Sequence, residues 1–186
     1  MRCQVASTGT DERSTIMIST LLTTFRQRQR RNSAPSALAT ANAIILELRG
    51  LGIVANAIRI QRLAILAQGW SLLLHEEPMY CDPTIVYGDT PAIAAVHSGL
   101  RRYGIGPVDA LIAHPDLPSF DHPADDDERR LQVVRQTVRS YGGFDSFQLG
   151  RILRDALPNL ENGDTVQTHL LRSAFHDMTI ETSAVS

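Results

Sequence analysis

The chain has 186 residues, of which 43% are hydrophobic, and its formal net charge is −2. This length suits one domain with tails, and the near-neutral charge excludes a strongly basic field over the whole surface, as nucleic-acid-binding proteins often have. The two cysteines, Cys3 and Cys81, form neither a disulfide framework nor a CxxC-type metal motif. We therefore expect a cytoplasmic protein in a reducing environment.

Residues 1–35 differ in composition from the rest of the chain. They are rich in Ser and Thr and include the basic run TTFRQRQRRNS, from Thr23 to Ser33. Such a segment cannot bury enough apolar surface to become ordered, so we expect a flexible leader, or an overlong start assignment with Met17 as the true first residue. An organellar presequence and a basic arm for an anionic partner are the alternatives.

From residue 36 to about residue 180 the spacing of apolar residues predicts a mostly α-helical, compact single domain, followed by a tail at residues 181–186. Ser36 can cap a first helix, and Gly50 and Gly52 end it. One face of this helix is apolar and carries Leu38, Ala41, Ile45 and Leu48. A stripe of this kind predicts burial against a neighbouring helix.

Asn56 can cap a second helix, which we expect from Ala57 to about His75. Its uncharged run is too short to cross a bilayer, and a helix that is apolar nearly all round is typical of a domain centre. We therefore predict a central buried helix and no membrane span. Gln61 and Gln68 lie one heptad apart on this helix, and their burial would require hydrogen-bond partners. Gly69 would let a neighbouring helix approach closely.

The sequence predicts at most a short β-element, and Met79–Tyr87 is the segment with a strand-like pattern. The stretch that follows, GDTPAIAAVHSGLRRYG, predicts a third helix. Asp89 or Thr90 would cap it, Pro91 would lie in its first turn, and Gly104 would end it. Its expected apolar stripe consists of Ile93, Val96, Leu100 and Tyr103.

Three further helices are predicted in the C-terminal part of the domain. The first runs from Asp125 to Tyr141, and the second follows a cap at Asp145 or Ser146. The last is expected from Thr165 to about Met178. Its expected apolar face consists of Val166, Leu170 and Ala174.

The central helix and the residues after it carry the pattern of a known family. The matching residues are Gln61-Arg62-Leu63 and Ala67-Gln68-Gly69-Trp70 in the helix, Pro78-Met79-Tyr80 and Asp82-Pro83 after it, and the pairs Tyr87-Gly88, Tyr103-Gly104 and Tyr141-Gly142. In these positions the segment from about Leu38 to Leu157 resembles the Panacea domain, which occurs in phage-associated proteins and in antitoxins of two-gene toxin–antitoxin systems. The chain departs from the family pattern at Gly88-Asp89-Thr90, where the family has Gly-Pro-Val, and at Leu153-Arg154, where it has Thr-His.

The resemblance implies a compact helical domain that neutralises a partner protein, either by direct binding or by presenting a toxin to a protease. It implies no known catalysis, so we expect a non-enzymatic antitoxin without cofactor or metal, whose partners are a cognate toxin and, in the second mechanism, a protease. Exposed Arg and Tyr side chains dominate many protein interfaces. The expected partner-binding residues are therefore Tyr87, Arg101, Arg102 and Tyr103. A solvated helix face with Tyr103 in the core is the alternative interpretation of the same residues.

DNA binding is the main alternative function. Two predicted helices flank the short glycine-containing turn YGGFDS, so the segment Tyr141–Leu157 has the pattern of a helix-turn-helix. The second of these helices offers Gln148, Arg151 and Arg154 as contacts. A hairpin of two core helices gives the same pattern, and Asp145 and Asp155 flank the helix with the wrong charge for phosphate.

A metal-dependent enzyme is the remaining alternative. The segment from His114 to Asp127 combines imidazoles with carboxylates, which can hold zinc or another divalent ion. Several prolines interrupt this segment, and a solvent-exposed loop that places Asp125–Asp127 at the start of the next helix explains the same residues. The absence of a G-x-S-x-G motif, a P-loop and a G-x-G-x-x-G motif also counts against an enzyme.

Overall fold

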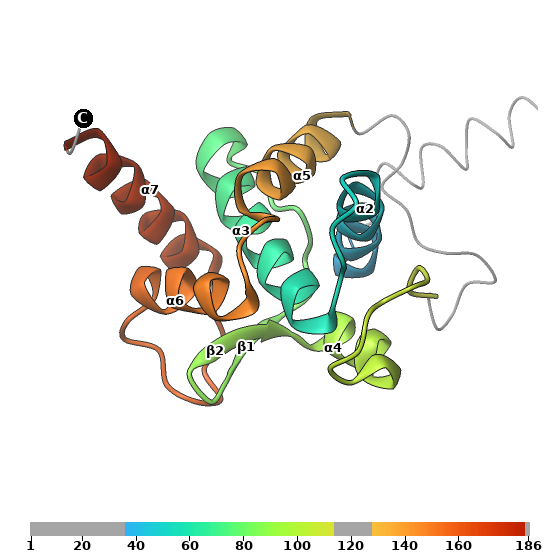
Figure 1. The fold of residues 1–186 in the computed structure, drawn as a ribbon. Coiled ribbons are helices and arrows are strands. Elements are labelled where there is room, and N and C mark those ends of the chain that lie inside the picture. Colours follow the sequence, from blue (N-terminus) through green and yellow to red (C-terminus); the bar gives the residue numbers. More distant parts are fainter. Residues whose placement is uncertain (1–35, 114–127, 185–186) are drawn as a thin grey trace, which may run out of the picture. The chain divides into compact units, whose positions relative to one another are not determined.

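The computed structural model describes residues 36–113 and 128–184, which belong to one compact unit, Ala34–Ser186. Within these ranges the protein is mostly helical, as the sequence predicts (Figure 1). The α-helices are α2 (Ala37–Gly50), α3 (Ala57–His75), α4 (Ala94–Leu100), α5 (Glu128–Tyr141), α6 (Ser146–Ala156) and α7 (Thr168–Ala184). A short 3-10 helix, η1 (Arg101–Tyr103), follows α4, and two strands, β1 (Thr84–Tyr87) and β2 (Thr90–Ile93), form an antiparallel hairpin. The predicted leader, residues 1–35, lies outside the described residues.

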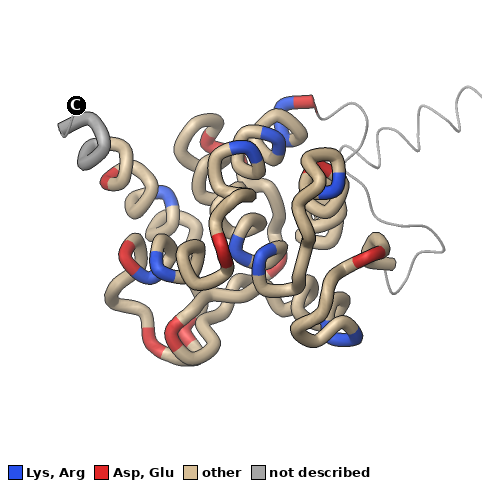
Figure 2. Tube along the Cα trace, viewed as in Figure 1, with Lys and Arg blue, Asp and Glu red and all other residues tan. Residues whose placement is uncertain are grey.

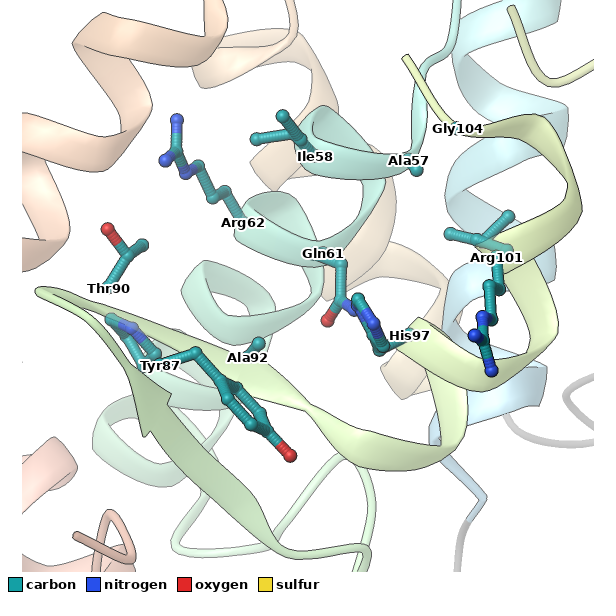
Figure 3. A pocket seen from close by; sticks show the side chains of 12 residues that line it. Ala57, Ile58, Gln61, Arg62, Tyr87, Thr90, Ala92, His97, Arg101 and Gly104 are labelled. Carbon is teal, nitrogen blue, oxygen red and sulfur yellow. The ribbon is translucent and has the colours of Figure 1, made fainter. Parts of the chain in front are cut away.

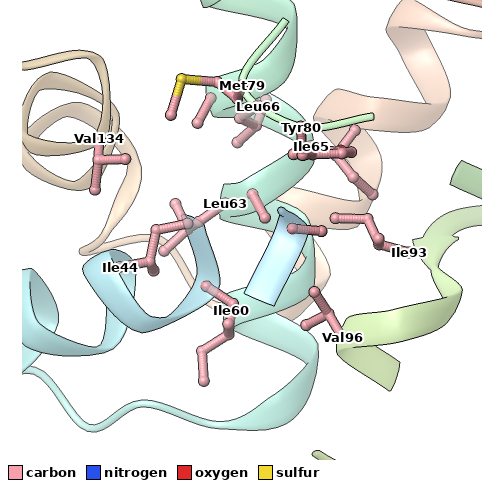
Figure 4. Close-up of a cluster of buried hydrophobic side chains, with 14 of the residues drawn as sticks. Ile44, Ile60, Leu63, Ile65, Leu66, Met79, Tyr80, Ile93, Val96 and Val134 are labelled. Carbon is pink, nitrogen blue, oxygen red and sulfur yellow. The ribbon is translucent and has the colours of Figure 1, made fainter. Parts of the chain in front are cut away.

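Helix α3 lies at the centre of these elements and packs against α2, α4, α5, α6, α7 and β2 (Figure 1). Its fully buried side chains include Ile60, Leu63, Ile65 and Leu66. Figure 4 shows the apolar side chains around them, which come from several elements and include Ile44, Ile93 and Val134. The predicted central buried helix is therefore confirmed. None of the helices in the two described ranges combines the length and the apolar character that a bilayer crossing needs.

Two buried glutamines on α3 hold the backbone of irregular segments against the helix. Gln61 accepts a hydrogen bond from the Ile93 N–H at 2.9 Å and donates one to the Ile93 carbonyl at 3.4 Å. Gln68 accepts from the N–H groups of Met79 (2.6 Å) and Tyr80 (3.3 Å) and donates to the Tyr80 carbonyl (3.2 Å). Buried backbone groups without a partner are costly, so each carboxamide replaces the partner that a regular helix or sheet would supply.

Gly69 allows α7 to approach α3 closely. A Cβ atom added at Gly69 would lie 2.3 Å from the Phe175 ring, which is nearer than any real Cβ contact. Phe175 is fully buried, and its ring meets that of Trp70 edge to face, with the centroids 5.2 Å apart. The close approach expected at Gly69 is confirmed, and α7 is the helix that makes it.

The prediction of the third helix is wrong in its first turn. Thr90–Ile93 form strand β2, paired with β1, and α4 begins only at Ala94. Gly88, with φ of 68°, lies in the turn between the strands, in a backbone conformation that favours glycine. The N–H and carbonyl of Ile93 bond to the side chain of Gln61 instead of continuing a helix. A contact with α3 therefore overrides the local pattern of a cap followed by proline.

The last helix begins later and continues further than predicted. Helix α7 spans Thr168–Ala184, because the residues before it extend alongside β1, where Val166 donates its N–H to a β1 carbonyl at 2.9 Å. The face of α7 that packs against α3 includes Leu171 and Phe175, whereas the predicted Leu170 is 41% exposed. The domain end predicted at residue 180 falls within this helix.

Three predicted helix caps are confirmed. The side chains of Ser36, Asn56 and Asp145 each accept a hydrogen bond from a backbone N–H two or three residues ahead. Gln148 also accepts from the N–H of Asp145, which completes a capping box at the start of α6. Helix α5 is described from Glu128 onward, and its predicted first residues lie outside the described ranges.

Candidate functional site

A pocket of about 380 Å³ lies between the first turns of α3, the hairpin and the α4–η1 segment (Figure 3). Its volume is at the lower end of the range for ligand pockets, roughly 300–1,000 Å³. The apolar part of its wall consists of Ala57, Ile58, Pro91, Ala92 and Leu100. The remaining lining residues are Gln61, Arg62, Tyr87, Thr90, His97, Arg101 and Gly104. None of the described residues that line this pocket carries a carboxylate or a thiol.

Two of the four predicted partner-binding residues, Tyr87 and Arg101, line this pocket (Figure 3). Tyr87 is 54% exposed, and its ring stacks on that of His97 with the centroids 6.2 Å apart. Arg102 and Tyr103 face elsewhere, since Arg102 donates to the Tyr103 hydroxyl at 2.7 Å and Tyr103 packs partly buried against the core. A 3-10 helix turns by about 120° per residue, so consecutive residues of η1 point in different directions.

Arg62 forms part of the pocket wall and connects α3 to α6. It donates a hydrogen bond from Nη1 to the carbonyl of Ser146, the first residue of α6. Gly150 of α6 lies against the same guanidinium, because an added Cβ there would be 2.8 Å from its Cζ. Partial burial lowers the pKa of Arg62 from its ordinary value, and neighbouring Arg154 lowers it further, whereas Asp89 raises it. Arginine titrates far above neutral pH, so this side chain still carries its charge.

An ion pair between Arg154 of α6 and Asp89 of the hairpin turn lies beside the pocket. The Nη1–Oδ2 distance is 2.5 Å, and the Thr90 hydroxyl donates to the other carboxylate oxygen at 2.9 Å. The hydrogen bonds from Arg154 and Thr90 hold the pKa of Asp89 below its usual value. Exposed ion pairs contribute little to stability. The effect of this pair on the site is to neutralise the one carboxylate of the hairpin turn.

Arg101 is the pocket arginine without a partner among the residues that the structure describes. No described residue makes a hydrogen bond or an ion pair with its guanidinium, whereas Arg62 is bonded to α6. Figure 3 shows the two arginines entering from different sides of the pocket, Arg62 from α3 and Arg101 from η1. The α6 side is therefore occupied by internal contacts, and the η1 side has a cation that can bind a ligand.

The pocket has an exposed apolar rim. The loop after η1 pairs with the segment before α3 through a hydrogen bond from the Val108 N–H to the Ala55 carbonyl at 2.8 Å. Exposed apolar residues of these two segments are Val54 (66%) and Ile105 (95%), of which Ile105 follows the lining residue Gly104, and Ile58 (45%) of α3 lines the pocket itself. Exposed apolar side chains beside a pocket favour an interaction site.

The predicted helix-turn-helix residues are mostly engaged within the domain. Gln148 belongs to the capping box of α6, and Arg154 pairs with Asp89. In the part of the chain that the structure describes, only Arg151 of the three predicted DNA contacts has no side-chain partner. Figure 2 shows basic and acidic positions interspersed over the described elements.

The predicted metal-binding segment, His114–Asp127, lies outside the described residues. Among residues 36–113 and 128–184, no group of three or more His, Cys, Asp or Glu side chains is placed to hold a metal ion. Cys81 is an exposed free thiol and lies apart from the pocket lining.

Sequence analysis did not identify Ile58, Arg62 or His97 as parts of one site. Arg62 had a detectable signal, because it is a charged residue in a helix that is apolar nearly all round. Ile58 and His97 had none, since their placement depends on where the hairpin and η1 lie relative to α3.

Comparisons of the chain with protein-family models, curated proteins and solved structures find no match. The interpretation of the pocket therefore rests on its geometry and on the sequence resemblance. Several residues that carry the resemblance have identifiable structural roles. Gln61 and Gln68 hold backbone segments, Arg62 connects two helices, and Gly69 admits Phe175.

Proposed function

We propose that this chain is a Panacea-like, non-catalytic protein-binding domain that acts as an antitoxin, and that its cognate toxin docks on the pocket bounded by Tyr87 and Arg101. The observation that carries the proposal is the convergence of these two residues, from β1 and η1, on one open pocket with an exposed apolar rim. Arg and Tyr are enriched among the residues that dominate protein interfaces. The sequence resemblance supports a toxin as the partner.

A growth assay tests this function. Each gene adjacent to this one is induced alone and then together with this chain. We expect one neighbour to arrest growth and co-expression to restore it. The absence of any toxic neighbour would refute the antitoxin function.

Variants of the chain test the docking surface in the same assay. We expect Tyr87→Ala and Arg101→Glu to weaken the rescue, because they remove an aromatic contact and reverse the available charge. Arg139→Glu is the matched control, since Arg139 is an exposed arginine of α5 outside the pocket lining. Loss of rescue confined to substitutions elsewhere would show that the toxin docks on another surface.

The abundance of the toxin separates the two mechanisms of neutralisation. Direct binding leaves the toxin level unchanged during rescue, whereas presentation to a protease lowers it. To measure this level, protein synthesis is stopped and a tagged toxin is followed over time by immunoblotting.

DNA binding is tested separately by electrophoretic migration of the upstream DNA in the presence of the chain at low salt. A shift that Arg151→Glu abolishes would favour the regulatory function instead.

A further inference from the structure

We infer that the pocket binds an acidic peptide segment of the partner protein, with an aliphatic side chain inserted between Ile58 and Tyr87 and a neighbouring carboxylate paired with Arg101. This inference rests on the proposed protein-binding function and specifies the chemistry of the segment that is bound. It follows from three features of the pocket, namely its charge, its backbone edge and the number of free donors.

The charge of the pocket favours an anionic peptide segment and determines on which side of the pocket its carboxylate lies. The described lining contains arginines and no carboxylate. The hairpin turn carries Asp89, which Arg154 already neutralises at 2.5 Å. Arg101, from η1, has no partner among the described residues. The carboxylate of the segment therefore lies at the η1 side, where charge complementarity is unsatisfied.

The strand that borders the pocket offers no free edge for pairing. The N–H and carbonyl of Ile93 are bonded to Gln61, and Pro91 has no N–H to donate. A partner strand consequently cannot extend the hairpin toward the pocket by main-chain hydrogen bonds. Recognition depends on side chains of the segment, which makes it selective for sequence.

The number of free donors favours a carboxylate over a phosphate. Phosphate sites in proteins collect several convergent donors. Here one N–H of Arg62 already donates to the Ser146 carbonyl, so Arg101 is the lining guanidinium without a hydrogen bond to any described residue. A single guanidinium matches one carboxylate in a two-point contact. The surrounding apolar rim then favours an aliphatic neighbour on the same segment.

Selection from random peptides tests this inference without knowledge of the toxin. Short random peptides displayed on phage are panned against the full chain, and enriched sequences are synthesised with a fluorescein label. We expect enrichment of Leu, Ile or Met next to Asp or Glu. Fluorescence polarisation of one such peptide should give an affinity that falls as the salt concentration rises. Enrichment of basic peptides, or no enrichment above the display background, would overturn the inference.

Matched variants locate the binding. Arg101→Glu should weaken binding of the labelled peptide by about tenfold or more, because a like charge replaces the pairing cation. Arg139→Glu changes the net charge equally and should leave affinity within about twofold. Ile58→Ser should also weaken binding, whereas Leu51→Ser, at a similarly exposed site outside the pocket, should not. Circular dichroism confirms that each variant is folded.

The outcomes separate this inference from the proposed function. Binding of acidic peptides that is insensitive to Arg101→Glu and Ile58→Ser overturns the assignment to the pocket, whatever the growth assay shows. Binding that requires both residues supports the inference even where no neighbouring gene is toxic, and in that case only the antitoxin function is refuted.

Discussion

In each half of α3 a buried glutamine forms hydrogen bonds with the backbone of a neighbouring segment, but the surroundings of the two glutamines differ. In the first half Gln61 holds the backbone of Ile93, and one heptad later Gln68 holds Met79 and Tyr80. Around Gln68 the space is filled, since Met79 and Tyr80 are each only 2% exposed. Beside Gln61 a pocket of about 380 Å³ remains open.

The difference arises from the neighbours of each glutamine and not from the glutamine itself. Near Gln68, Gly69 leaves room for Phe175, so α7 closes over this half of the helix. Near Gln61, the exposed Ile58 and the charged Arg62 line the open pocket, and α6 contacts the Arg62 guanidinium from one side. One half of α3 therefore serves stability, and the other leaves a surface for binding.

Removal of Gln68 should have the largest effect. Gln68→Met keeps the side-chain size but leaves two N–H groups and one carbonyl, of Met79 and Tyr80, without a partner in a sealed region. Each buried unpaired group costs about 1–3 kcal/mol, so we expect a loss of about 3 kcal/mol in the free energy of unfolding. Urea denaturation measures it. Gln132→Met, at an exposed position of α5, is the control and should change stability by less than about 0.5 kcal/mol.

Gly69→Ala should come next, with a loss of about 1–3 kcal/mol, because the new methyl group collides with the Phe175 ring. Helix propensity alone would favour alanine by about 1 kcal/mol, so the sign of the change identifies steric conflict. Gly50→Ala is the matched control: nothing lies within 4 Å of its added Cβ, and we expect slight stabilisation. Thermal unfolding compares the two. If adding Phe175→Leu does not reduce the cost of Gly69→Ala, the collision is not its cause.

Gln61→Met should cost less, about 1–2 kcal/mol, although it also removes the partner of a buried strand residue. It frees two backbone groups where Gln68→Met frees three, and its bond to the Ile93 carbonyl is long, at 3.4 Å. Hydrogen exchange at the Ile93 amide, together with urea denaturation, measures the effect. A loss equal to that of Gln68→Met would show that the number of freed groups does not set the cost.

Features that depend on neighbouring residues were predictable from the sequence. The caps at Ser36, Asn56 and Asp145 follow from side chains that bond to backbone two or three residues away. The burial of α3 follows from its long uncharged run between Arg62 and His75. The need of Gln61 and Gln68 for partners was also evident, because a buried amide requires them.

Features that depend on distant contacts were not predictable. Strand β2 has a local pattern for a helix start, and only its contacts with β1 and Gln61 make it extended. The start of α7 is delayed by pairing with β1, and its packing against α3 buries Leu171 and Phe175 while Leu170 is exposed. Of the expected partner-binding residues, Arg102 lies outside the pocket lining and donates a hydrogen bond to the Tyr103 hydroxyl, and the sequence did not indicate this separation from Arg101.

The smallest predicted effect concerns pH at the open half of α3. The hydrogen bonds from Arg154 and Thr90 lower the folded-state pKa of Asp89, so the stabilisation from this pair is fully present above the unfolded pKa of about 3.9. It is lost as the pH falls through the lower, folded-state pKa. Titration of the Asp89 carboxyl carbon by NMR should therefore give a higher midpoint in Arg154→Met than in the unsubstituted chain. Equal midpoints would mean that the pair does not form in solution, and Asp89 would then stand as an uncompensated negative charge beside a pocket that we infer binds acidic segments.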